Sequence, residues 1–208
     1  MKTNVAGLAG HSSAVGGICA LALLWPQLAA AICEATPADQ LGPYYEQGAP
    51  YSGVIAGPEE EGQRLVISGR VLGAPDCRPL SDAVVDVWQA SASGEYYSLG
   101  QDGERFRLRG RVRTDPEGRY RIDSILPGRY AIGPGYYRPP HVHFAVSHAD
   151  YTTVVTQVYF KGEGFQDWPP FAEPTRVVEL EKVTGEQGEP IYTGTFDIIL
   201  PPGKGTVP

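Results

Sequence analysis

Two histidines, His141 and His143, stand two residues apart in the stretch R-P-P-H-V-H-F. Neutral imidazole is the commonest metal ligand among side chains, so a His-x-His pair could clamp a metal ion with two nitrogens. If the stretch is a strand, the two rings lie side by side on one face, while Val142, Phe144 and Val146 face the core. Taken alone, the pair is more typical of ordinary strand histidines, and the neighbouring motifs must decide.

Three further stretches place aromatic and polar residues at fixed spacings. They read W-Q-A-S-A-S-G-E-Y at 88–96, P-G-R-Y at 127–130 and T-Q-V-Y-F at 156–160. Together with the histidine stretch they resemble the intradiol ring-cleavage dioxygenases, the non-haem Fe(III) enzymes that include protocatechuate 3,4-dioxygenase and catechol 1,2-dioxygenase. The resemblance runs from about Gly42 to Phe160. The motifs are specific as a group, although each piece alone is weak.

The resemblance implies that each chain holds one ferric ion through two tyrosinates and two histidines, at Tyr96, Tyr130, His141 and His143. Tyr97 is an alternative to Tyr96, but the fixed distance from the motif tryptophan favours Tyr96. A free tyrosine has a pKa of about 10, so a phenolate at neutral pH needs a strong local positive charge, which a trivalent metal supplies. Hard phenolate oxygens in turn favour Fe(III) over softer, thiol-binding ions.

The resemblance also implies roles for residues around the metal. Arg138 matches the family arginine that stabilises negative charge on the bound ring, a task that suits an always-charged, planar guanidinium. Gln157 matches the glutamine that helps to orient a histidine and the ring. We expect the substrate pocket to be bordered by Pro43, Tyr44 and Gly94. Whether the G-P-Y-Y segment borders its own pocket or that of a neighbouring subunit stays open.

The implied reaction is cleavage of a catechol by O2 between its two hydroxyl-bearing carbons, which gives a cis,cis-muconate-type product. The expected partners are therefore a small aromatic diol and O2. Two alternatives stay open. The G-x-V, G-x-Y and P-G-x-Y patterning also suits a non-enzymatic binding module, a β-sandwich of the transthyretin-like or carboxypeptidase-regulatory type. The two histidines alone could instead hold copper or zinc, and metal content would separate the three interpretations.

Strands must position these residues. Apolar or β-branched segments recur about every ten residues between turn signals. They lie at 64–72, 83–90, 107–115, 118–126, 128–133, 141–148, 152–160, 176–183 and 191–200. The sequence D-P-E-G at 115–118 favours a tight turn, and no segment has a convincing helical pattern. We therefore expect an all-β fold, an antiparallel β-sandwich whose long loops carry a mononuclear metal site.

The bulk properties limit the remaining choices. The chain has 208 residues, of which 42% are apolar, with 26 glycines and 19 prolines, which suits one turn-rich domain with a substantial core. The net charge is −7 and the basic residues are scattered, so nucleic acid is not an expected partner. We assign this domain to residues 32–208, with residues 32–60 as an irregular N-terminal arm. The sequence leaves a homo-oligomer open.

The first 31 residues have the order of a signal peptide. Lys2 precedes an apolar run at 14–25, and small residues follow at 29–31. The run is shorter than the ~20 residues of a membrane-spanning helix, so we expect a secreted or periplasmic protein without a stable membrane span. Cys33 and Cys77 would then be an even pair in an oxidising compartment. A disulfide between them is the favoured interpretation, and two free thiols are the alternative.

Overall fold

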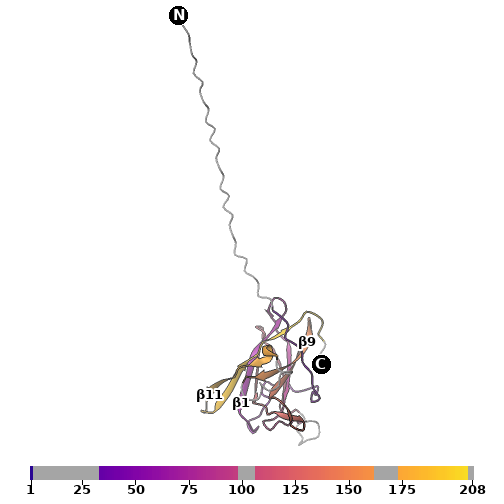
Figure 1. Cartoon of the computed structure of the whole chain (residues 1–208), viewed down its shortest axis with the longest axis vertical. Coiled ribbons are helices and arrows are strands. Elements are labelled where there is room, and N and C mark those ends of the chain that lie inside the picture. The colour runs from indigo at the N-terminus through magenta and orange to yellow at the C-terminus, as the bar shows by residue number, and fades with distance from the viewer. Residues whose placement is uncertain (2–32, 98–105, 162–172, 206–208) are drawn as a thin grey trace.

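Strands make up nearly all the regular structure of the chain. Figure 1 shows the computed structural model, in which residues 1, 33–97, 106–161 and 173–205 are described. The expected signal peptide, residues 1–31, lies outside the described residues apart from Met1. The one described helix is a 3-10 turn, η1 (Pro174–Arg176). No helix within the described ranges is long and apolar enough to cross a membrane.

One layer is a five-stranded sheet with the order β10-β9-β8-β3-β4. Its strands are β3 (Val84–Gln89), β4 (Arg109–Arg113), β8 (His141–His148), β9 (Tyr151–Phe160) and β10 (Val177–Val178). Neighbours pair antiparallel, except that β10 runs parallel to β9. This sheet carries both histidines of the His-x-His pair.

The second layer is a six-stranded sheet with the order β11-β12-β1-β13, in which β2 and β5 also pair with β1. Its strands are β1 (Arg64–Gly73), β2 (Arg78–Pro79), β5 (Arg119–Ile125), β11 (Glu181–Thr184), β12 (Pro190–Thr195) and β13 (Ile198–Leu200). The antiparallel expectation holds for β5 and β2, whereas β12 and β13 run parallel to β1. Alternation reports which face of a strand is buried, and it carries no information on strand direction.

Two segments expected as single strands are each divided in two. Residues 176–183 form β10 and β11, which belong to different sheets. Residues 191–200 form β12 and β13, which follow successive parts of β1. Between them Phe196 is buried in the core, and its N–H donates to the Ser68 carbonyl at 2.9 Å. The chain therefore changes its alignment at Phe196 while remaining beside β1.

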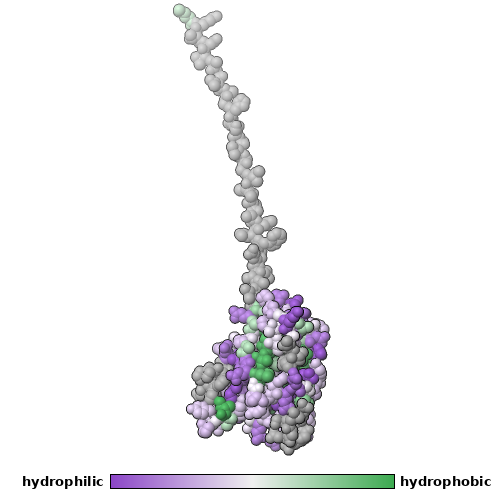
Figure 2. All heavy atoms as spheres, turned by 90° about the vertical axis from the view of Figure 1, so that its right-hand side faces the viewer, coloured by the Kyte–Doolittle hydropathy of each residue, from purple (hydrophilic) through white to green (hydrophobic). Residues whose placement is uncertain are grey.

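The apolar core lies between the two sheets. It includes Leu65, Ile67, Ile122, Ile198 and Leu200 from one layer and Val85, Val87, Val142, Phe144, Val146 and Val158 from the other. Burial of each such side chain stabilises the fold by roughly 1.5–3 kcal/mol. Hydrophilic residues dominate the face drawn in Figure 2. Because Val142, Phe144 and Val146 of β8 fill the core, His141 and His143 face the opposite side of the sheet, as expected.

A separate hairpin joins β6 (Tyr130–Gly133) to β7 (Tyr136–Arg138). These strands pair with each other and form a sheet of their own. Tyr130 stands directly opposite Arg138 in the register. The sequence predicted the first of these strands and not the second, which is three residues long and runs into two prolines.

The N-terminal arm, of which residues 33–60 are described, forms hydrogen bonds with both sheets before β1 begins. Its Thr36 N–H donates to the Ile199 carbonyl of β13 at 3.0 Å, and its Asp39 N–H donates to the Val155 carbonyl of β9 at 2.8 Å. Apart from isolated bridges to the sheets it has no strand of its own. The arm is therefore an ordered segment whose position is fixed by hydrogen bonds to both sheets.

A disulfide fixes the start of the arm. Cys33 and Cys77 are bonded with their Cα atoms 5.3 Å apart, which is the favoured one of the two alternatives that the sequence left open. The Cys33 N–H also donates to the Pro75 carbonyl at 3.0 Å. The arm is thus covalently tied to the turn that joins β1 to β2.

Candidate functional site

The two histidines lie at the start of β8 with their rings together. Their Nε2 atoms are 3.2 Å apart, and each residue is 2% exposed. His141 Nδ1 lies 2.6 Å from the Pro139 carbonyl, which assigns the ring proton to Nδ1 and leaves Nε2 as a lone pair facing His143. Burial lowers the pKa of His141 to about 4 and that of His143 well below its usual value. Both rings are therefore neutral at pH 7, as metal ligands must be.

Two tyrosines from separate segments complete the cluster. The Tyr96 hydroxyl, in the loop after β3, lies 3.4 Å from His141 Nε2. Tyr130, at the start of β6, packs edge to face with Tyr96 at 5.5 Å between ring centres and lies 5.6 Å from the His141 ring centre. Tyr97 instead packs its ring under the guanidinium of Arg107 at 4.1 Å. Of the two tyrosines that the motif left open, Tyr96 faces the histidines.

The donor set fits a hard, highly charged cation. Burial raises the pKa of the Tyr96 and Tyr130 phenols above the ordinary value, and the positive charge of Arg138 opposes this in both. Such phenols lose their protons only to a strong positive charge, which Fe(III) would provide. The described part of the chain contains no cluster of three or more His, Cys, Asp or Glu able to hold a metal ion. A metal bound here would therefore draw on the phenol oxygens.

The ring of His143 is held from two sides. Trp88, its partner in the register of β3 and β8, stacks on it with ring centres 4.8 Å apart and planes 10° from parallel. Tyr45 packs on Trp88 in turn at 4.8 Å. On another side Gly42 has a φ of 76°, and a Cβ there would lie 3.3 Å from His143 Cε1. The start of the G-P-Y-Y segment can approach the ring closely because the residue is glycine.

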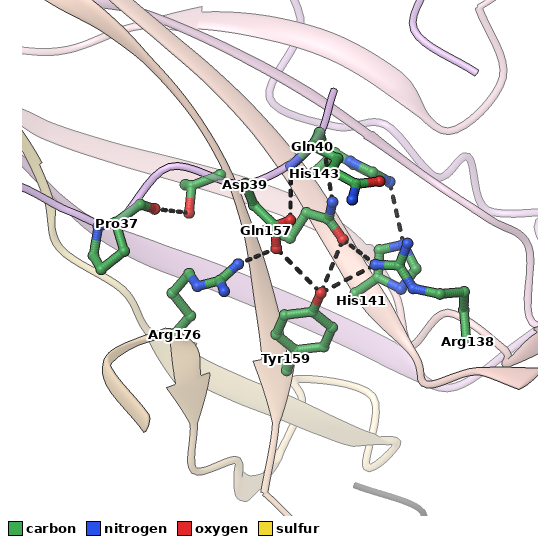
Figure 3. Close-up of polar contacts among 10 residues, drawn as sticks. Pro37, Asp39, Gln40, Arg138, His141, His143, Gln157, Tyr159 and Arg176 are labelled. Atoms are coloured by element: carbon green, nitrogen blue, oxygen red, sulfur yellow. Dashed lines mark hydrogen bonds and ion pairs between the residues drawn. The ribbon is translucent and has the colours of Figure 1, made fainter. Parts of the chain in front are cut away.

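Arg138 and Gln157, the expected catalytic pair, meet beside the cluster (Figure 3). Arg138 projects from β7 opposite Tyr130, and its Nη2 donates to Gln157 Oε1 at 2.6 Å and to the Tyr159 hydroxyl at 3.1 Å. Gln157 is fully buried and stands opposite His143 in the register of β8 and β9. The guanidinium is thereby anchored to the same sheet as the histidines.

The three expected pocket residues have different settings. The Tyr44 ring stacks on Tyr96 with centres 4.2 Å apart and planes 8° from parallel, and it is 37% exposed. Pro43 is an exposed turn residue. Gly94 has a φ of 85°, and a Cβ there would lie 2.2 Å from the Arg129 carbonyl oxygen. Gly94 therefore lets the Tyr96 loop pack directly against the backbone at the start of β6.

Arg109 is a site residue that sequence reasoning missed. It lies on β4 and is 3% exposed. Its guanidinium donates to the Tyr44 carbonyl and, at 3.0 Å, to the Tyr97 carbonyl, so it joins the arm to the loop that carries Tyr96. In the stretch R-L-R-G-R-V-R nothing distinguishes this arginine from its neighbours.

Three more polar residues with little exposed side chain were missed. Asp39 of the arm forms an ion pair with Arg176 of η1, and the Tyr159 hydroxyl lies 3.3 Å from Asp39 Oδ2. For Tyr159 a signal existed, because it follows Gln157 by two residues in a predicted strand and must share its face. The arm and the 3-10 turn have no periodic pattern from which the burial of Asp39 or Arg176 could be predicted.

Comparisons with known proteins show which proteins this chain is similar to. A family model described as "Dioxygenase" matches residues 41–202. A 157-residue alignment is 36% identical to catechol 1,2-dioxygenase 2 of Acinetobacter lwoffii and covers 68% of this chain and 56% of that protein. A 158-residue alignment is 37% identical to the protocatechuate 3,4-dioxygenase beta chain of Burkholderia cepacia, with coverage of 68% and 66%. The chain thus spans less than two thirds of the length of these relatives.

A solved structure has the same architecture. It is the dioxygenase domain of a dioxygenase carbohydrate-binding protein fusion from the cellulolytic bacterium Streptomyces sp. SirexAA-E. The TM-score is 0.69 at 29% identity, over 82% of this chain and 100% of that one. The all-β sandwich expected from the sequence is confirmed.

Proposed function

The chain belongs to the intradiol ring-cleavage dioxygenase family, and from this premise we propose that it is a non-haem Fe(III) enzyme that cleaves a catechol. Cleavage falls between the two hydroxyl-bearing carbons, and both atoms of O2 enter a cis,cis-muconate-type product. The observation that carries the proposal is the convergence of two partly buried phenols and two neutral imidazoles from three separate segments.

In this proposal the ferric ion is held by Tyr96, Tyr130, His141 and His143. When bound, it supplies a Lewis-acidic centre that binds the diol and activates its ring. The first contribution of the chain's own residues is to accept a proton from the diol. Burial raises the pKa of the Tyr130 phenol, so this oxygen would hold one of the two protons that the diol loses on binding, and solvent would take the other.

Charge stabilisation falls to Arg138. Its positive charge lowers the pKa of Tyr96 and Tyr130, which burial raises. The guanidinium therefore stabilises negative charge on oxygen atoms in the region where the diol oxygens would lie. A fixed guanidinium beside a dianionic ring stabilises charge in the transition state without reorganising. Trp88 and Gly42 fix the His143 ring, and the burial of both histidines keeps water away from their side of the site.

The two alternatives account for fewer of these features. A non-enzymatic binding module has no need of a lone pair on His141 that faces both a second imidazole and a phenol. A copper or zinc site on His141 and His143 alone gives no role to Tyr96 and Tyr130, which lie against the same rings.

We further propose that the protein acts outside the cytoplasm. The signal-like order of residues 1–31 and the Cys33–Cys77 disulfide both support export, because structural disulfides persist in oxidising compartments. The intact mass of exported protein should correspond to a chain without residues 1–31 and without free thiols. A recovered mass that includes those residues would contradict the assignment.

The visible absorption spectrum tests the proposed function. We expect a red-brown band from tyrosinate-to-Fe(III) charge transfer that moves to longer wavelength when catechol is added without O2. Tyr96→Phe and His143→Ala should lose iron, colour and turnover together. Tyr97→Phe is the matched control, because that ring packs under Arg107 and the variant should keep all three. A wild-type protein that stays colourless after reconstitution with iron would favour the binding module.

A further inference from the structure

Arg138 depends on other elements for its orientation. The hairpin of β6 and β7 that carries it belongs to neither of the two larger sheets. Two contacts of its guanidinium come from β9, where Nη2 donates to Gln157 Oε1 at 2.6 Å and to the Tyr159 hydroxyl at 3.1 Å. A guanidinium stabilises developing charge only if its donors already point at that charge. The orientation of these two β9 side chains is therefore part of the site.

The N-terminal arm holds both β9 side chains from the other side (Figure 3). Gln157 Nε2 donates to the Gln40 carbonyl at 2.8 Å, which fixes the amide so that its oxygen faces Arg138. The Tyr159 hydroxyl accepts from Arg138, and its single proton has two acceptors within reach, the charged Asp39 Oδ2 at 3.3 Å and the amide Gln157 Oε1 at 3.1 Å. One hydroxyl thus connects the arm to the arginine.

The Asp39 carboxylate is itself tightly fixed. Its side chain is 11% exposed and pairs with the Arg176 guanidinium, whose side chain is 5% exposed. Its Oδ1 accepts the Gln40 N–H at 2.7 Å. A buried charge is costly unless it is both paired and hydrogen-bonded, and both conditions are met here. Arg176 therefore serves as the counter-ion that lets a carboxylate lie beside the Tyr159 hydroxyl.

We propose that Asp39 is a positioning residue that, paired with Arg176, holds the Tyr159 hydroxyl in place. Through that hydroxyl it directs Arg138 toward the bound ring. The described contacts of its carboxylate are with Gln40, Tyr159 and Arg176, so it acts through another side chain. The inference rests on the proposed function, and it gives the N-terminal arm a role in positioning the side chains of the site.

Turnover of catechol at known iron content is the first test. Asp39→Asn keeps the size of the side chain and removes its charge, and kcat/KM should fall roughly ten- to hundredfold as Arg138 loses its alignment. Iron content and the visible band should stay at wild-type values. Glu34→Gln removes a carboxylate from an exposed position of the same arm and should leave kcat/KM unchanged. Loss of iron from Asp39→Asn in proportion to activity would overturn the proposal.

Unfolding of the iron-loaded protein tests the same link without turnover. In a cycle of Asp39→Asn, Tyr159→Phe and the double variant, the unfolding equilibrium constant of the double variant should differ from the product of the single effects by at least about fivefold. An additive cycle would overturn the proposal. If the wild type leaves catechol unchanged, the proposed function fails, and the unfolding cycle still decides whether Asp39 holds Tyr159.

Discussion

At the scale of single residues, burial also controls the charge of side chains outside the cluster of Tyr96, Tyr130, His141 and His143. The Tyr45 hydroxyl donates to Asp86 Oδ2 at 3.3 Å, and the Tyr45 ring packs on the tryptophan that covers His143. Burial raises the pKa of Asp86 to about 6, although the hydrogen bond from Tyr45 and the charges of Arg111 and Arg109 lower it. An acid with ordinary chemistry therefore titrates close to neutral pH because of where the fold places it.

Asp86→Asn is expected to change how stability depends on pH. The folded-state pKa of Asp86 lies above the unfolded value of about 3.8, so its contribution to stability is full below pH 4 and is lost as pH rises through 6. The neutral variant has no such loss, and its stability relative to wild type should rise between pH 4 and 7 by up to about 3 kcal/mol. Denaturant titrations across this range measure the difference, and parallel curves would contradict the assignment.

At the scale of elements, sequence alternation predicted most strands, because burial of one face is a local property. The parallel partners of β1 and the short β7 were not predicted, since pairing is decided between distant segments. The same division holds for the site. The family resemblance that the motifs carry implied a common site for Tyr96, Tyr130 and the two histidines. The roles of Asp39 and Arg109 arise from tertiary contacts that no local pattern records.

Gly94→Ala should separate two elements that carry site residues. The added Cβ would meet the Arg129 carbonyl oxygen at 2.2 Å, so the loop that ends in Tyr96 must move away from β6. We expect a loss of more than about 3 kcal/mol in the free energy of unfolding, together with weaker iron retention. Gly188→Ala is a matched control, because its φ of 87° is similar and nothing lies within 4 Å of its Cβ position.

The control should cost about 1 kcal/mol, the price of a left-handed backbone in alanine, with iron retention unchanged. Thermal unfolding and metal analysis of the two variants measure both quantities. Equal losses in the two would show that backbone strain, rather than the contact with Arg129, explains the glycine.

At the scale of the whole molecule, the arm joins both layers to the site. It starts at the Cys33–Cys77 disulfide, bonds to β13 through Thr36 and to β9 through Asp39, and then reaches the site rings at Gly42. The same segment therefore contributes to the stability of the fold and to the geometry of the site. A change at the covalent end of the arm is expected to reach the site through it.

Reduction of the disulfide should show this coupling. The bond closes a sequence separation of 44 residues, so its loss should lower the free energy of unfolding by up to about 4 kcal/mol. Catechol turnover should fall with it as the arm loosens. Denaturant titrations with and without reductant measure the first effect. The double variant Cys33→Ser, Cys77→Ser, compared with wild type in the absence of reductant, measures the second, because reductant would also act on ferric iron. Equal catechol turnover of variant and wild type at equal iron content would contradict the coupling.

The parallel pairing of β1 with β12 and β13 also affects when the sheet can fold. The first long strand of the domain pairs with segments that are synthesised much later, and the hydrogen bond of Thr36 to Ile199 also joins distant parts of the chain. Pairings between distant segments form slowly, because the intervening chain loses conformational entropy before the contacts stabilise the fold. A growing chain that has not yet reached β13 cannot complete this sheet, so the two-layered core behind the candidate site should form only after Leu200 has been synthesised.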